Sequence, residues 1–126
     1  MKNLLIYIAS PISQGVLRDN VARACSAGHQ LMQAGIPVLI PHLSVFLGMK
    51  QNYDGAGGYV PEVLPLDTTL KQWYLMGIMM VLHCDAVLRL PGDSVGADME
   101  TGMADKNNIP VFHSVEKVIL WARDKL

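Results

Sequence analysis

The sequence predicts an α/β protein of the three-layer Rossmann-like or flavodoxin-like class, with a four- to five-stranded parallel sheet and helices on both faces. Short apolar runs alternate with helix-length segments along the whole chain, which is the pattern of strand–helix–strand units. Glycine or proline stands at most of the boundaries between these segments. The 126 residues are 51% hydrophobic, so we expect one packed domain over residues 1–126.

The local pattern predicts the first three elements. Residues 3–8 are apolar, β-branched and aromatic without alternation, which indicates a strand buried on both faces. A helix is expected over residues 16–34, ended by Gly35. Residues 37–40 predict a short second strand. The residues expected on the inward stripe of the helix are Leu17, Val21, Cys25, Gly28, Leu31 and Met32.

The middle of the chain is less regular. Residues 43–66 are interrupted by glycines and prolines and predict a long loop. Such a loop is either a lid over a substrate or a plain surface excursion. Asp67 then caps a helix that extends to about His83.

The segment Leu70–Leu82 of this helix is apolar on almost all sides. A helix that packs on a sheet needs one apolar stripe, so the rest of this surface needs another partner. Its methionines suit an adaptable interface, and we therefore expect a homodimer formed through this helix. Burial within the monomer is the alternative.

The last third of the chain repeats the alternation of strand and helix. It predicts a third strand over residues 85–90, a helix capped by Ser94, a fourth strand over residues 110–113 and a final helix capped by Ser114. In a parallel sheet, ligands bind beyond the carboxyl ends of the strands. The loops that follow the four strands are therefore the expected site.

Composition narrows the classes of function. The formal net charge is −1 with scattered cations, so we expect no binding to duplex nucleic acid. Cys25 and Cys84 lack metal-ligand spacing and are expected to be reduced thiols. The apolar runs are too short for a signal peptide or a membrane span. We expect a cytoplasmic protein with no metal, cofactor or membrane partner.

The segment over residues 90–100 carries the strongest chemical signal. Pro91 and Gly92 break the strand, Ser94 caps the next helix, and Gly96 permits close approach of a ligand to the backbone. Free N–H groups in the first turn of a helix bind anions. Because Glu100 follows about one and a half turns later, this segment predicts a phosphate or sugar cradle beside one carboxylate.

Four motifs together resemble the nucleoside 2-deoxyribosyltransferase superfamily, and in particular its small phage-encoded and bacterial members of uncharacterised function. They lie at residues 7–13, 85–87, 91–100 and 109–111, so the resemblance spans most of the chain. The third also resembles the Pro-Gly-Gly-x-Gly-Thr-x-x-Glu element of phosphoribohydrolases that cleave nucleoside monophosphates. The resemblance implies cleavage or transfer at an N-glycosidic bond of a nucleoside or nucleoside 5′-monophosphate.

The resemblance also implies roles for particular residues. Glu100 matches the nucleophile that attacks the anomeric carbon, and Ser94 and Gly96 match the residues that hold a 5′-phosphate. Tyr7 matches an aromatic residue that lines the sugar and base pocket. Further substrate-binding positions are expected in the first loop, at the end of the second strand and at the break of the third, namely Ala9, Ser10, Ser13, His42 and Gly92.

Two positions depart from the pattern of these families. Gly77 stands where an aspartate usually faces the nucleobase, and Ser13 stands where the nucleotide hydrolases have an arginine. Candidate donors to the leaving base are then His42, Tyr7, or Tyr53 or Asp54 of the long loop. The alternative is a non-catalytic protein that binds or senses a nucleotide. A third reading is an unrelated small-molecule or interaction role on the same kind of fold.

Overall fold

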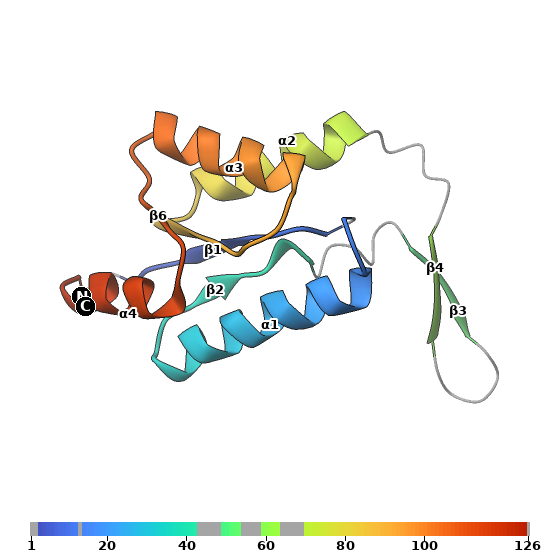
Figure 1. The fold of residues 1–126 in the computed structure, drawn as a ribbon, viewed down its shortest axis with the longest axis horizontal. Helices are drawn as coiled ribbons and strands as arrows, with labels where there is room; N and C mark the ends of the chain where they lie inside the picture. Colours follow the sequence, from blue (N-terminus) through green and yellow to red (C-terminus); the bar gives the residue numbers. More distant parts are fainter. Residues whose placement is uncertain (1–2, 13, 43–48, 54–58, 64–69, 126) are drawn as a thin grey trace.

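The computed structural model describes residues 3–12, 14–42, 49–53, 59–63 and 70–125. At its centre is a four-stranded sheet in the order β2-β1-β5-β6, and every neighbouring pair in it is parallel. Helices cover both faces (Figure 1). The predicted α/β fold class is therefore confirmed. The strands of this sheet are β1 (Ile6–Ala9), β2 (Val38–Leu39), β5 (Ala86–Arg89) and β6 (Val111–Phe112).

Two helices lie on each side of the sheet (Figure 1). One layer holds α1 (Leu17–Gln33) and α4 (Val115–Arg123), and the other holds α2 (Leu70–Leu82) and α3 (Val95–Lys106). Ser94 and Ser114 cap α3 and α4 through their side chains, as predicted. None of the helices in the described part of the chain is long and apolar enough to cross a membrane.

Strand β1 divides the core into two layers. All four of its residues are buried, because β2 and β5 pair with its two edges and helices cover both of its faces. Ile6 and Ile8 belong to the core beneath α1 and α4, whereas Tyr7 and Ala9 belong to the core beneath α2 and α3. This alternation of side chains along a strand places Tyr7 in the same layer as α3.

The inward face of α1 differs from the predicted stripe. Leu31 and Gly28 are buried as expected, but Met32 is 61% exposed and Asn20 is buried. The helix buries the small residues Ala24 and Ala27, which allow it to lie close to the sheet. Gly35 ends the helix with a φ of +82°, as predicted for a residue in the left-handed region.

The prediction of a loop over residues 43–66 is wrong for two segments within it. Strands β3 (Met49–Tyr53) and β4 (Tyr59–Val63) form an antiparallel pair, with Gln51 opposite Pro61. Proline removes a ladder hydrogen bond, which is why β4 does not resemble a strand in the sequence. Asp54, and Asp67 as the predicted cap of α2, lie outside the described residues.

Candidate functional site

The carboxyl ends of β1 and β5 meet at the point where the chain changes direction across the sheet. These two strands are neighbours, and Ala9 pairs with Arg89 at their ends. The helix after β1 and the helix after β5 leave toward opposite faces (Figure 1). This is the switch point at which parallel α/β sheets bind ligands.

Gly92 brings the two loops of this switch point into contact. Its φ is +120°, a conformation that side chains with a Cβ rarely adopt. A Cβ at this position would also lie 2.7 Å from Cγ of Pro11 in the first loop. Only glycine fits at position 92, because any side chain would collide with Pro11. The contact between the two loops places Gly92 beside the candidate site.

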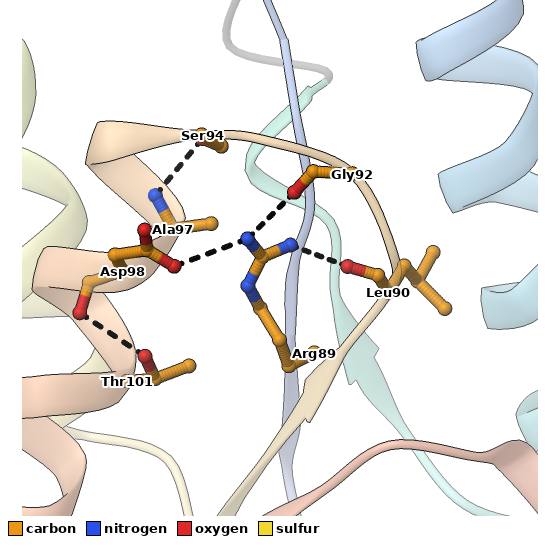
Figure 2. A network of polar contacts seen from close by, with 7 residues as sticks. All are labelled: Arg89, Leu90, Gly92, Ser94, Ala97, Asp98 and Thr101. Atoms are coloured by element: carbon orange, nitrogen blue, oxygen red, sulfur yellow. Dashed lines mark hydrogen bonds and ion pairs between the residues drawn. The ribbon is translucent and has the colours of Figure 1, made fainter.

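Arg89 organises the turn between β5 and α3 (Figure 2). Its guanidinium donates hydrogen bonds to the carbonyl oxygens of Leu90 and Gly92, and it forms an ion pair of 3.2 Å with Asp98 of α3. The Arg89 side chain is only 11% exposed, whereas that of Asp98 is 73% exposed. Arg89 is thus a positioning residue for the turn, and the sequence analysis did not identify it.

Ser94 begins α3 as predicted. Its hydroxyl oxygen accepts a hydrogen bond of 3.1 Å from the backbone N–H of Ala97 (Figure 2). The N–H groups of this first turn point toward the carboxyl edge of the sheet. A Cβ on Gly96 would lie 3.3 Å from Cε1 of Tyr74, so the small size of Gly96 also serves the packing of α2 on α3.

The structure brings Glu100, Tyr7 and Gly77 together from three elements. The Tyr7 hydroxyl lies on the same side of Gly77 as the Glu100 carboxyl and favours the ionised form of that carboxyl. A Cβ built on Gly77 would lie 3.2 Å from Oε2 of Glu100 and 3.4 Å from the Tyr7 hydroxyl. The backbone of α2 therefore packs directly against this carboxyl. The sequence motifs gave no indication that Gly77 and Glu100 are neighbours.

The carboxyl of Glu100 is in an unusual electrostatic state. Burial raises its pKa from 4.5 to about 7, and the Tyr7 hydroxyl and the charge of Arg89 only partly oppose this rise. Its Oε2 is buried and has no hydrogen-bond partner among the described residues. A buried, unpartnered carboxyl oxygen with a pKa near neutrality is characteristic of functional sites.

Tyr7 keeps its proton at all physiological pH values. Burial, followed by the nearby Glu100 carboxyl, raises the pKa of this hydroxyl far above its ordinary value. Tyr7 is 1% exposed. It is therefore a neutral hydroxyl beside Glu100.

His42 connects the end of the second strand to the first loop. It is fully buried, and its Nε2 donates a hydrogen bond of 3.0 Å to the carbonyl oxygen of Pro11. Burial lowers the pKa of His42, so the imidazole is neutral. Its Nδ1 and the Ser10 hydroxyl are buried without a hydrogen-bond partner among the described residues. His42 thus supports the loop, and in this conformation it does not face solvent.

The first loop has a second support that the sequence analysis missed. The Asn20 side chain donates hydrogen bonds to the carbonyl oxygens of Ile12, at 3.0 Å, and Gln14, at 2.6 Å. Asn20 thereby fixes the chain on both sides of Ser13, which itself lies outside the described residues. Ala9, predicted to bind substrate, is fully buried in the core.

An open groove of about 340 Å³ lies at the same edge of the molecule. It runs between the first loop, the start of α1 and the turn at Gly92, with Asp19 and Arg23 on its wall. Tyr7 and Glu100 do not line it. Among the described residues, no three side chains of the types His, Cys, Asp or Glu gather into a possible metal site.

The fold and this site define a class of protein: a parallel α/β domain with a half-buried carboxyl, Glu100, on the helix that follows the switch point. Within that class, residues 4–113 match the model of the family described as a domain of unknown function, DUF4406. The match covers most of the chain, so the protein belongs to this family. A search of curated proteins found no match.

Proposed function

We propose that this protein cleaves or transfers at the N-glycosidic bond of a nucleoside or nucleoside 5′-monophosphate, with Glu100 as the nucleophile. The observation that carries the proposal is the half-buried Glu100 side chain beside the switch point, whose Oε2 is buried without a hydrogen-bond partner among the described residues and whose pKa is raised to about 7. Carboxylates in this role attack the anomeric carbon through an oxocarbenium-like transition state. The ionised form of Glu100 performs the attack.

The start of α3 supports the same substrate class. The capped first turn presents backbone N–H groups at the carboxyl edge of the sheet, and Glu100 follows on the same helix. A 5′-phosphate bound at that turn would place the sugar of a nucleotide near Glu100. We propose Ser94 and Gly96 as the residues of this phosphate site.

A second candidate function is nucleotide binding without catalysis. Gly77 favours it, because a glycine against Glu100 supplies no acid for a departing base. A binding protein needs the phosphate site but no such acid.

The experiment that separates the two functions is base release from ribo- and deoxyribonucleosides and their 5′-monophosphates, measured by chromatography. We expect free base with the wild-type protein and only background with Glu100→Gln. The control is Asp105→Asn, which removes an exposed carboxylate from the same helix. Thermal stabilisation by a nucleotide without release of base would support the binding function instead.

We also propose that the protein forms a homodimer through α2. Leu75, Met79 and Leu82 recur at helical spacing on this helix and are 57%, 49% and 38% exposed. In a two-fold symmetric dimer, the same apolar face of a second copy of the chain would pack against it.

A further inference from the structure

Helix α2 lies directly over one oxygen of the Glu100 carboxyl. The side of α2 that faces α3 carries Tyr74 and Gly77, and a Cβ on Gly77 would lie 3.2 Å from Oε2 of Glu100. The helix backbone itself therefore covers this oxygen. Glycine weakens the middle of a helix relative to alanine. The close approach of α2 to Glu100 accounts for a glycine at this position.

This contact suits the protonated carboxyl better than the ionised one. Oε2 is buried and has no hydrogen-bond partner among the described residues. Loss of the proton would leave a negative charge on a carboxyl of which one oxygen is shielded from water, and a buried charge without hydrogen-bond partners is costly. Any movement that admits water to Oε2 therefore stabilises the ionised form of Glu100.

The titratable and charged groups around Glu100 do not remove this cost. The Tyr7 hydroxyl, from β1, and the guanidinium of Arg89, from β5, both favour the ionised form. The donors of the guanidinium are directed into the turn after β5 and to Asp98 (Figure 2). From α2 the described neighbour is Gly77, which carries no charge. Burial outweighs these effects and raises the pKa of Glu100 to about 7, so the charge appears near neutral pH.

The two ends of α2 differ in how firmly they are held. Val81, near the end of the helix, and Cys84, just beyond it, are 0% and 6% exposed and belong to the core shared with α3. Burial raises the pKa of the Cys84 thiol to about 11, so this group stays neutral. In the first half of the helix, the described side chains are half-buried or exposed. Because segments with little buried surface open at the lowest cost in free energy, the first half is the part that can separate from α3.

We propose that the first half of α2 is a gate over Glu100, which rests on the protonated carboxyl and separates from α3 when the carboxyl is ionised. The helix turns about its buried end at Val81 and Cys84. The proton passes to solvent, and water reaches Oε2 as the gate opens. This conformational change does not depend on the proposed reaction. If that reaction takes place, the open form is the one in which Oε2 can meet a sugar.

Hydrogen–deuterium exchange of α2 peptides at about pH 6 and about pH 8 tests the gate, with each rate corrected for chemical exchange at that pH. A detached helix of 13 residues is marginal in water, so its amides exchange when it leaves α3. The covered carboxyl has a pKa of about 7, whereas an exposed one has the ordinary value of 4.5. The population of the open form should therefore rise about tenfold between the two pH values.

Two variants assign the effect to Glu100. Glu100→Gln cannot ionise, so its α2 should exchange at the same corrected rate at both pH values. Asp105→Asn removes an exposed carboxylate from the same helix and should keep the rise of the wild type. Peptides of α1, in the opposite layer, report unfolding of the whole domain and should exchange more slowly than those of α2.

Three results would overturn the gate. The first is an unchanged corrected rate in the wild type, and the second is a rise that persists in Glu100→Gln, because another group would then drive the opening. The third is equal protection of α2 and α1 at both pH values, because α2 would then separate only when the whole domain unfolds. Each of these results leaves the proposed glycosidase function to its own test by base release, and a failure to release base leaves the gate standing.

Discussion

Glu100 combines a half-buried position with a proposed role that requires its charge. Burial favours the neutral acid, whereas nucleophilic attack requires the carboxylate. The Tyr7 hydroxyl and the charge of Arg89 favour the ionised form and hold the pKa to about 7. The side chain is therefore ionised in a large part of the population at neutral pH.

The raised pKa of Glu100 predicts a pH-dependent loss of stability. The unfolded chain releases this proton near pH 4.5 and the folded chain near pH 7, so the stabilisation by the protonated form is complete below pH 4.5 and is lost as the pH rises through 7. The shift of the Glu100 pKa from 4.5 to about 7 corresponds to about 3 kcal/mol in the free energy of unfolding. Urea unfolding of wild type and Glu100→Gln at about pH 5 and about pH 8 measures it. The wild type should lose more stability than the variant, and equal losses would contradict the assigned pKa.

Tyr7 should influence the reaction through Glu100. The Tyr7 hydroxyl lowers the pKa of Glu100, so Tyr7→Phe should move the acidic limb of the pH–rate profile upward by about one pH unit. The pH dependence of base release measures this position. A lower rate with an unmoved limb would indicate that Tyr7 contributes only packing.

At the scale of single residues, the sequence predicted the residues that act through local geometry. Ser94, Ser114 and Gly35 were identified because capping and helix termination depend on a few neighbouring residues. Asn20 and Arg89 were missed, because their partners are backbone carbonyls of loops whose course the sequence does not determine. The contact of Gly77 with Glu100 was missed because it depends on how α2 packs against α3.

At the scale of elements, α3 carries both the proposed phosphate site and the proposed nucleophile. Ser94 caps the helix, and Glu100 lies further along the same rigid element. A 5′-phosphate bound at the first turn would thereby fix the distance between the sugar and the carboxyl. In this proposal the helix sets the spacing between the phosphate and the carboxyl.

The two serine caps provide a matched pair for testing this role. Ser94→Ala and Ser114→Ala each remove an N-cap and should each destabilise the protein by about 1 kcal/mol. Only Ser94→Ala should weaken the binding of nucleoside 5′-monophosphates, by about tenfold, because α4 begins away from the proposed phosphate site. Calorimetric titration measures this affinity. Equal affinities of the two variants would exclude Ser94 from the phosphate site.

The elements of the parallel sheet were predictable because each is a short apolar run bounded by turn residues. The antiparallel pair of β3 and β4 was not, because its segments carry polar residues and Pro61. The stripe on α1 was rotated in the prediction because Asn20 resembles a surface residue until its two carbonyl partners are known. In both cases tertiary contacts override the local pattern.

At the scale of the whole molecule, the exposed apolar face of α2 predicts the oligomeric state. Met79→Lys places a charge in the centre of the face and should convert a dimer into a monomer in analytical ultracentrifugation. Leu120→Lys is the control, because Leu120 is 59% exposed on α4, in the opposite layer. A monomeric wild-type protein would contradict the proposed dimer.

The proposed reaction requires a covalent bond between Glu100 and the sugar. The most direct test is peptide mass spectrometry after reaction with a nucleotide whose sugar carries fluorine at C2, because fluorine slows hydrolysis of the glycosyl ester. We expect the mass of the fluorinated sugar on the peptide that contains Glu100, and no adduct in Glu100→Gln. Release of base with an adduct on another residue would contradict the proposed role of Glu100, as would an adduct that persists in Glu100→Gln.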